Sequence, residues 1–395
     1  MEFNVFQNNK ALMKVQEENG WKLYKFDDIL IDDTRNAIKI KKELYLEYGE
    51  YPIIDQGKNE IAGYTNEVEG IYKEEALVFG DHTRIIKYID FPIFLGADGV
   101  KLLKLKSNKE KISIKYLYYF LNTVKLPNDG YSRHFKYLKQ TVIPVPELDI
   151  QMKIVKCMDK ANELIDKRKE QIKTLDELVK SQFIKMFGDP ITNPKNIEQV
   201  YLKDLSKLIT KGASPNWQGI EYVDDETQTL FVTSENVRDG YIDLSKKKFL
   251  MDAFNEKQKR SVLQSGDFLI NIVGASIGRA AQFNLDIKAN INQAVALVRL
   301  KDGVINDKYL LTYLNSPKAL KMYESMQVSV ARANLSLQNI NDLEILLPPK
   351  ELQNQFADFV KQVDKLKFEM ENSLKELEDN FNSLMQKSFK GELFN

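Results

Sequence analysis

Between residues 150 and 187, hydrophobic positions recur at alternating steps of four and three, which places them on one face of a long helix. Eight of the ten positions in this ladder, which runs from Ile154 to Met186, are apolar. The same ladder recurs 202 residues later, from Phe356 to Ser388, again with eight apolar positions. Neither ladder is interrupted by Pro or Gly. The pattern predicts two long helices, each roughly 55 Å in length at about 1.5 Å per residue.

The polar residues of the two ladders fall at positions that are not equivalent. Wherever one ladder is polar the other is apolar, so that Arg168 corresponds to Met370, Gln182 to Leu384, Lys367 to Ile165 and Ser388 to Met186. Two stripes with this complementarity are expected to pack on each other. The sequence therefore predicts an antiparallel intramolecular coiled coil.

The sequence also repeats outside the helices. The octet KYLYYFLN at 115–122 matches KYLLTYLN at 308–315, and ADGVKLLKLK at 97–106 matches NQAVALVRLK at 292–301. Gly188, Pro190 and Pro194 indicate a linker after the first helix. The predicted layout is an N-terminal extension at 1–18, a variable domain at 19–148, a long helix at 149–188, a linker at 189–199, a second variable domain at 200–348 and a second long helix at 349–395.

Short runs rich in Val, Ile and Phe inside the variable domains are predicted as strands. They include ALVFG from Ala76 and DFLINIV from Asp267, whereas the two repeated octets are predicted as short helices. A parallel α/β sheet would require long helices between its strands, and the sequence shows none there. The predicted fold class is therefore α+β, with curved β-sheets in two domains and a pseudo-two-fold internal repeat.

Composition adds mainly exclusions. The 395 residues contain 57 Lys plus Arg and 57 Asp plus Glu, so net charge gives no electrostatic argument for nucleic-acid binding. A single cysteine, Cys157, excludes an internal disulfide and a Cys-rich zinc site. The first residues do not resemble a signal peptide, and no run of eighteen apolar residues occurs. We therefore expect a cytoplasmic protein without contact to a membrane.

Motifs for catalysis and for cofactor binding are missing from the sequence. VGASIGR from Val273 lacks the Lys of a phosphate-binding loop, and FLGADG from Phe94 does not open a predicted helix. The Asn-Pro-Pro-aromatic tetrad of adenine methyltransferases is absent. The two histidines, each beside an Arg, have no Cys pair near them, so a metal site is not expected. The sequence predicts no catalytic residue, no metal ligand and no cofactor in this chain.

Polar loop clusters differ between the two halves while the sequence around them repeats. Arg, Lys, Asn, Ser and Thr can match the donors and acceptors of base edges, although each cluster could also be an ordinary solvated loop. The candidate DNA-binding residues are Lys58, His82, Thr83, Arg84, Arg133 and His134 in the first half, and Lys211, Asn216, Trp217, Arg238, Ser276, Arg279, Asn290, Asn292, Arg332 and Asn334 in the second.

Several phrases together resemble the specificity subunit of a type I restriction-modification system. They are LVFGDHTR with FPIFLGADGVKLL in the first half, GDFLINIVGASIGRAA with NINQAVALVRL in the second, the exits VIPVPELDIQ and LPPKELQ, and FIKMFGDP beside LMQKSFKGEL. The resemblance covers nearly the whole chain and identifies the variable domains as target recognition domains. One departure is that the second domain is about 26 residues longer than the first, by the difference between repeat offsets of 202 and 176.

The resemblance implies a non-catalytic DNA-recognition subunit. Each recognition domain would read one half of a bipartite, asymmetric site in double-stranded DNA, and the helices would set the gap between the halves. Two modification subunits, which use S-adenosylmethionine, would dock on this chain, and restriction subunits would join with ATP and Mg. Two alternatives remain at this point: a coiled-coil scaffold protein, and the detached recognition subunit of a methyltransferase-only system.

Overall fold

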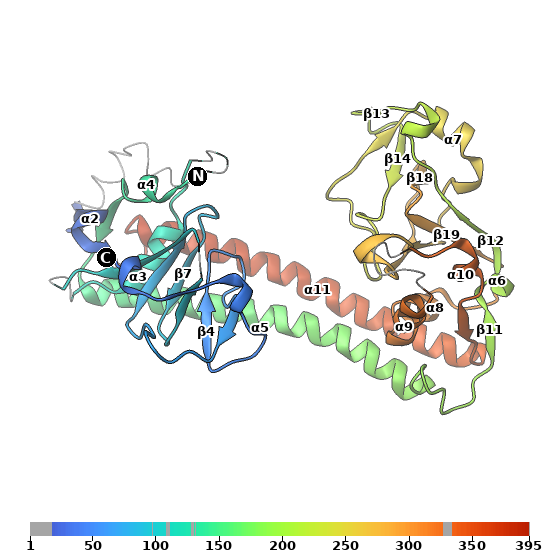
Figure 1. Ribbon diagram of the computed structural model, residues 1–395, viewed down its shortest axis with the longest axis horizontal. Coiled ribbons are helices and arrows are strands. Elements are labelled where there is room, and N and C mark those ends of the chain that lie inside the picture. Colours follow the sequence, from blue (N-terminus) through green and yellow to red (C-terminus); the bar gives the residue numbers. More distant parts are fainter. Residues whose placement is uncertain are drawn as a thin grey trace. The chain divides into compact units, whose positions relative to one another are not determined.

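The computed structural model describes residues 18–96, 98–107, 111–127, 130, 132–326 and 334–394. By its internal contacts the chain divides into two compact units. The first unit comprises Met1–Glu170 and Glu371–Asn395, and the second comprises Gln171–Met370. The boundaries fall inside the two long helices, α5 (Leu148–Phe187) and α11 (Lys350–Phe389). Each unit therefore contains one variable domain and part of both long helices (Figure 1).

The first unit contains a two-stranded antiparallel sheet and two four-stranded sheets. The small sheet pairs β1 (Lys22–Lys25) with β10 (Val142–Val145). The first larger sheet is antiparallel, in the order β2 (Leu30–Asp32), β9 (Val100–Leu105), β6 (Ala76–Gly80) and β7 (Ile86–Ile89). The second is mixed, in the order β3 (Lys39–Ile40), β8 (Phe94–Gly96), β4 (Tyr51–Ile54) and β5 (Gly63–Thr65). In the described part of this unit, the α-helices besides the long ones are α2 (Phe26–Ile29), α3 (Ile114–Asn122) and α4 (Phe135–Leu138).

The second unit repeats this arrangement. Its small antiparallel sheet pairs β11 (Gln199–Tyr201) with β20 (Glu344–Leu346). The antiparallel four-stranded sheet has the order β12 (Ser206–Lys211), β19 (Val295–Leu300), β16 (Asp267–Asn271) and β17 (Ala280–Phe283). The mixed sheet has the order β13 (Tyr222–Val223), β15 (Phe249–Leu250), β14 (Thr229–Val232) and β18 (Ala289–Ile291). The shorter α-helices among the described residues of this unit are α6 (Leu202–Leu205), α7 (Ala253–Lys257), α8 (Asp307–Leu314), α9 (Pro317–Ser325) and α10 (Leu337–Asn341).

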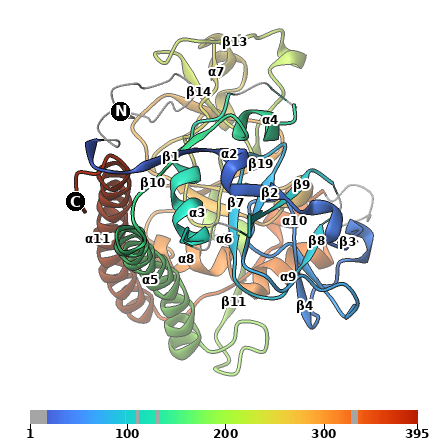
Figure 2. The same cartoon turned by 90° about the vertical axis from the view of Figure 1, so that its left-hand side faces the viewer.

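The buried strands explain why each unit folds as layers. All five residues of β6 are buried, as are all five of β16, because both strands are central and covered on both faces. In the first unit α3 packs against the antiparallel four-stranded sheet, beside β7 (Figure 2). Tyr116 and Phe120 of α3 lie in the hydrophobic core of this unit. Mostly antiparallel strands and short helices confirm the predicted α+β class with curved sheets.

The repeated exits from the variable domains make the same hydrogen bonds in both units. Gln151 accepts from the Ser113 N–H at 2.9 Å and donates to the Pro146 carbonyl at 2.8 Å. In the second unit, Gln353 accepts from the Asn306 N–H at 2.7 Å and donates to the Pro348 carbonyl at 2.7 Å. Since Ser113 and Asn306 are the N-caps of α3 and α8, each Gln ties a short helix to the start of a long one.

The two long helices contact each other in both units. In the first unit Lys169 of α5 forms an ion pair of 3.2 Å with Glu378, late in α11. In the second unit Asp176 of α5 forms an ion pair of 2.6 Å with Lys367 of α11, and at the end of α5 the Phe187 ring centroid lies 5.5 Å from that of Phe356, near the start of α11. Rising residue numbers on α5 therefore face falling numbers on α11, which confirms the predicted antiparallel pairing.

Candidate nucleic-acid interface

Three loops of the first unit meet one another. The backbone N–H of His82 donates to Gln56 Oε1 at 3.3 Å. A Cβ atom added to Gly99, whose φ is 68°, would lie 2.7 Å from Gln56 Nε2 and 2.8 Å from His82 Cδ2, so this close approach requires glycine. Polar segments that are far apart in sequence are thereby gathered at one place. These loops follow β4, β6 and β8, at residues 55–60, 81–85 and 98–99.

A buried lysine holds the first of these loops in shape. Lys87, on β7, is 7% exposed, and its ammonium donates to the carbonyls of Asp55 at 2.8 Å and Asn59 at 2.6 Å. Burial lowers the pKa of this ammonium below its ordinary value, although the charge of Asp55 opposes the shift. With its ends fixed in this way, the loop presents Lys58 to solvent.

Replacing Lys87 by methionine is expected to loosen residues 55–60 without unfolding the unit. The substitution keeps the length of the side chain but removes a charged donor from the part-buried carbonyls of Asp55 and Asn59, at a cost of about 1–3 kcal/mol. Amide hydrogen exchange in the loop should therefore become roughly five- to 150-fold faster. The matched control is Lys73→Met, an exposed lysine of the same unit, which should leave exchange unchanged. Equal effects of the two substitutions would contradict the role given to Lys87.

His134 is buried, which corrects its expected role as a DNA contact. It is 1% exposed, and both its Nδ1 and its backbone nitrogen contact the Asp81 carbonyl oxygen, at 3.0 and 2.9 Å. The Asp81 carboxylate accepts from the Phe135 N–H at 2.7 Å. His134 thus fastens the start of α4 to the loop after β6. Its neighbour Arg133 is exposed beside it.

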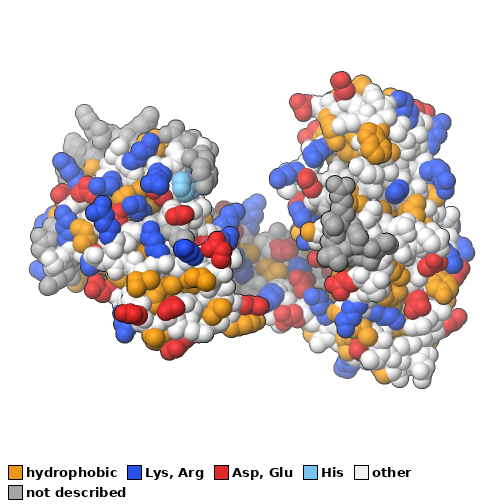
Figure 3. Space-filling view, in the orientation of Figure 1, with side chains coloured by type: hydrophobic (Ala, Val, Ile, Leu, Met, Phe, Trp, Pro, Cys, Tyr) orange, Lys and Arg blue, Asp and Glu red, His pale blue; other side chains and the backbone are white. Residues whose placement is uncertain are grey.

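The remaining candidates of the first unit lie at or near its surface. Arg84 has a φ of 64°, in the left-handed region that is uncommon for residues other than glycine, and its N–H donates to the Gly80 carbonyl at 2.7 Å. This tight turn leaves the side chain exposed. Figure 3 shows several Lys and Arg side chains gathered on one face of this unit. The exposed candidates are Lys58, Thr83, Arg84 and Arg133, and His82 is half-buried.

The second unit uses equivalent loops, which follow β14, β16 and β18, but ties them with different residues. Asn271, at the end of β16, is fully buried, and its amide donates to the Ser234 carbonyl at 3.0 Å and to the Ser276 hydroxyl at 3.1 Å. Asn236 accepts from the Thr233 N–H at 2.9 Å and donates to the Asp243 carbonyl at 2.9 Å. Two buried amides thus hold a rigid polar loop region.

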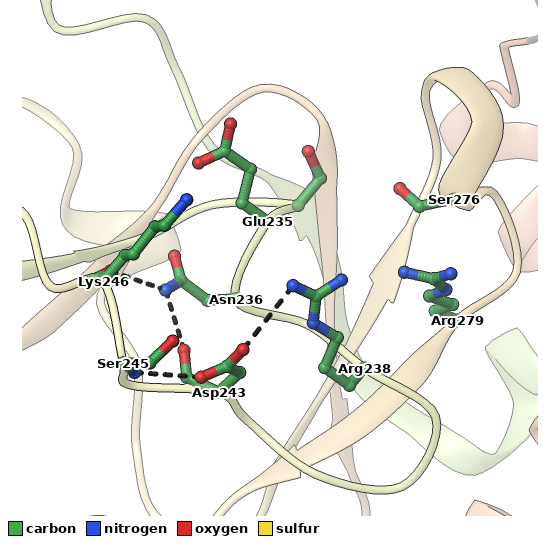
Figure 4. Close-up of a pocket in the computed structure, with 9 residues that line it drawn as sticks. Glu235, Asn236, Arg238, Asp243, Ser245, Lys246, Ser276 and Arg279 are labelled. Atoms are coloured by element: carbon green, nitrogen blue, oxygen red, sulfur yellow. Dashed lines mark hydrogen bonds and ion pairs between the residues drawn. The ribbon is translucent and has the colours of Figure 1, made fainter. Parts of the chain in front are cut away.

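A polar pocket lies between these loops (Figure 4). The Gly240 N–H donates to the Ala280 carbonyl at 2.9 Å, which brings the turn after Arg238 against the segment that carries Arg279. Both arginines line the pocket, and its volume is about 250 Å³. Arg238 forms an ion pair of 3.5 Å with Asp243. A hydrogen bond from Ser245 and the charge of Arg238 hold the pKa of the Asp243 carboxylate below its ordinary value, so the pair is charged at neutral pH.

Two further candidates extend the same loop region. Asn292 follows β18 and is half-buried, and its N–H donates to the Val232 carbonyl at 3.1 Å, at the end of β14. Asn334 is exposed and forms an isolated β-bridge with Val273, in the loop after β16. Loops after three strands of the second unit therefore meet, as they do in the first unit.

Five other candidates are placed elsewhere or remain undescribed. Asn290 is fully buried and donates to Asn255 Oδ1 at 2.8 Å, so its expected base contact is corrected to a structural role. Lys211, at the end of β12, is exposed, as are Asn216 and Trp217, which lie on a separate 3-10 turn. These three residues do not line the pocket. Arg332 lies outside the described residues.

Sequence reasoning missed the residues that hold the loops, namely Lys87, Asn236 and Asn271. One signal was available, because Asn271 directly follows the apolar residues FLI of the predicted strand and a polar residue there is buried only with partners. Within the described ranges, no group of three or more His, Cys, Asp or Glu side chains is arranged to hold a metal ion. Over those same ranges, no helix is both long enough and apolar enough to span a membrane.

Comparison with known proteins identifies both halves of the chain. The family described as "Type I restriction modification DNA specificity domain" matches residues 18–175 and again residues 194–379. The EcoBI type I restriction enzyme specificity subunit of Escherichia coli is 23% identical over 74% of this chain and 68% of its own. The MjaVIII specificity subunit of Methanocaldococcus jannaschii is 22% identical over 93% of this chain and 91% of its own.

A solved structure shares the fold over almost the full length. It is described as the structural basis of complex assembly and conformational transition of the type I R-M system. The match covers 94% of this chain and 98% of the chain in that structure, with a TM-score of 0.56 at 16% sequence identity. This likeness extends over both variable domains and both long helices.

Proposed function

Because the chain belongs to the type I restriction modification DNA specificity domain family, we propose that it is the DNA sequence-specificity subunit of a type I restriction-modification complex. The observation that carries this proposal is that the same family matches the chain twice, once over each variable domain. This double match favours DNA recognition over a role as a coiled-coil scaffold. In each unit, loops after three equivalent strands meet, and their exposed side chains differ between the units. Two recognition domains that share one fold but carry different loops are expected to bind a DNA site whose two halves differ in sequence.

The proposed contacts are the exposed and half-buried polar side chains of these loops. Arginine and asparagine can form bidentate bonds with guanine and adenine edges, while lysine and hydroxyl groups also bind phosphates. The surfaces that we propose for DNA contact are Lys58, His82, Thr83, Arg84 and Arg133 in the first unit, and Arg238, Ser276, Arg279, Asn292 and Asn334 in the second.

We propose that the chain itself performs no catalysis and acts in the cytoplasm. In this account two modification subunits that use S-adenosylmethionine dock on it, and restriction subunits that use ATP and Mg can join them. The long helices would serve as the docking surface and would set the gap between the two half-sites. The chain has equal numbers of acidic and basic residues. This balance supports the proposal that the partner subunits supply many of the contacts to DNA phosphates.

The experiment that tests this function is a selection from randomised duplex DNA with the full-length chain at low salt. We expect two short specified blocks separated by an unspecified gap of constant length. Binding by the chain alone should weaken steeply as salt increases, because each phosphate contact releases counterions. Enrichment of no motif, or of one continuous block, would contradict the proposal.

A further inference from the structure

The pocket between the loops of the second unit has a composition that limits what it can hold. Arg238, Arg279 and Lys246 contribute three positive charges, and Glu235 and Asp243 contribute two negative charges, so its net charge is only +1. A phosphate would approach two carboxylates there. At about 250 Å³ the pocket is also smaller than the roughly 300–1,000 Å³ typical of cofactor and drug-sized ligands. A neutral group with adjacent hydrogen-bond acceptors fits this pocket better than a phosphate or a cofactor-sized ligand.

The two arginines differ in a way that also favours directional recognition. Arg238 is braced by Asp243 at 3.5 Å, and that carboxylate is fixed by the Ser245 N–H at 2.9 Å. A braced guanidinium has a fixed direction, and part of its charge is neutralised. Arg279 is half-buried and makes no side-chain hydrogen bond or ion pair with the residues that the structure describes. Figure 4 shows both guanidinium groups in the pocket, with the Ser276 hydroxyl beside them.

We propose that this pocket receives the major-groove edge of a guanine, with Arg279 donating to O6 and N7 and Arg238 supplying a second, fixed donor. Among base edges, guanine is the one that presents two adjacent acceptors to the major groove, and a planar guanidinium matches them with two parallel hydrogen bonds. Asp243 is then a positioning residue, because it acts through Arg238. The inference rests on the proposed function and adds the base that the second unit reads.

The test uses the full-length chain in the randomised-duplex selection, followed by competition binding with single-base variants of the enriched site. The wild-type chain should enrich a motif with an invariant G·C pair in one block. For Arg279→Ala, preference for guanine at that position should fall about 5- to 150-fold, while the other block is unchanged. Arg279→Lys should lose most of the same preference, since a lysine lacks the planar fork. Asp243→Asn should reduce preference in the same block by a smaller factor.

Arg260→Ala is the matched control, because Arg260 is exposed in the same unit and does not line the pocket. It should leave both blocks unchanged. The inference is overturned if the Arg279→Ala protein keeps the guanine preference. It is also overturned if this substitution weakens binding equally for all sequences and reduces the salt dependence, because that result indicates a phosphate contact. Failure of the wild-type chain to enrich any motif overturns the proposed function itself. The melting curve of the Arg279→Lys protein shows whether this variant still folds, and this distinguishes loss of recognition from loss of folding.

Discussion

Replacing Phe356 by alanine is expected to destabilise the second unit by about 3–5 kcal/mol. Phe356 is fully buried near the start of α11, and its ring centroid lies 5.4 Å from that of Phe183 and 5.5 Å from that of Phe187. The change removes both the buried apolar surface and the edge-to-face contacts that join α5 to α11 in this unit. For a unit of this size the melting temperature should fall by roughly 6–20 °C.

The control for this prediction is Phe368→Ala on the same helix. Phe368 is 63% exposed, so its removal should change stability by no more than about 0.5 kcal/mol. Calorimetry of the full-length chain measures both variants under identical conditions. Similar melting temperatures for the two variants would contradict the packing of α11 on α5 that places Phe356 in the core.

Replacing Arg299 by methionine is the second large effect that we expect. Arg299 Nε and Nη2 donate to the two carboxylate oxygens of Asp267, each at 2.8 Å, and Asp267 is 1% exposed. Loss of the guanidinium leaves the buried carboxylate with the Gln264 N–H at 2.7 Å but without its charged partner, which typically costs about 3–5 kcal/mol. Chemical denaturation followed by circular dichroism should show a lower midpoint for the second unit.

A double variant distinguishes loss of this ion pair from loss of packing. Arg299→Met combined with Asp267→Asn removes the stranded charge and should recover part of the lost stability. Lys207→Met serves as the surface control, because Lys207 pairs with Asp302 and both side chains are largely solvent-accessible. That exposed pair should contribute at most about 1 kcal/mol. A loss as large for Lys207→Met as for Arg299→Met would exclude a special role for the buried pair.

The sequence predicted the long helices well, because their packing is periodic. A ladder that recurs after 202 residues requires only that one face of each helix be apolar, and α5 and α11 are separated by the same offset in the structure. The central strands were predicted for a similar reason, since ALVFG and the FLI segment of DFLIN are short apolar runs. The parallel pairing of β4 with β8 and of β14 with β18 had no local signal, because it joins segments far apart in sequence.

The candidate interface was predicted only in outline. Residue type alone placed His134 and Asn290 among the DNA contacts, although both are buried and bonded within the protein. The same reasoning could not identify Lys87 or Asn271, because a lysine or asparagine that holds a loop has the same composition signal as one in solvent. What separates these roles is burial and the direction of the side chain, and both depend on contacts between distant segments.

The central claim is that each unit reads its own half of a divided site through its own loops. It is tested most directly by Lys58→Ala, Thr83→Ala and Arg84→Ala combined in one full-length protein, with the selected DNA motif as the readout. All three side chains are exposed on loops of the first unit. We predict that one block of the motif loses its sequence preference while the other block and the gap length are retained. Loss of preference in both blocks, or an unchanged motif, would contradict the account.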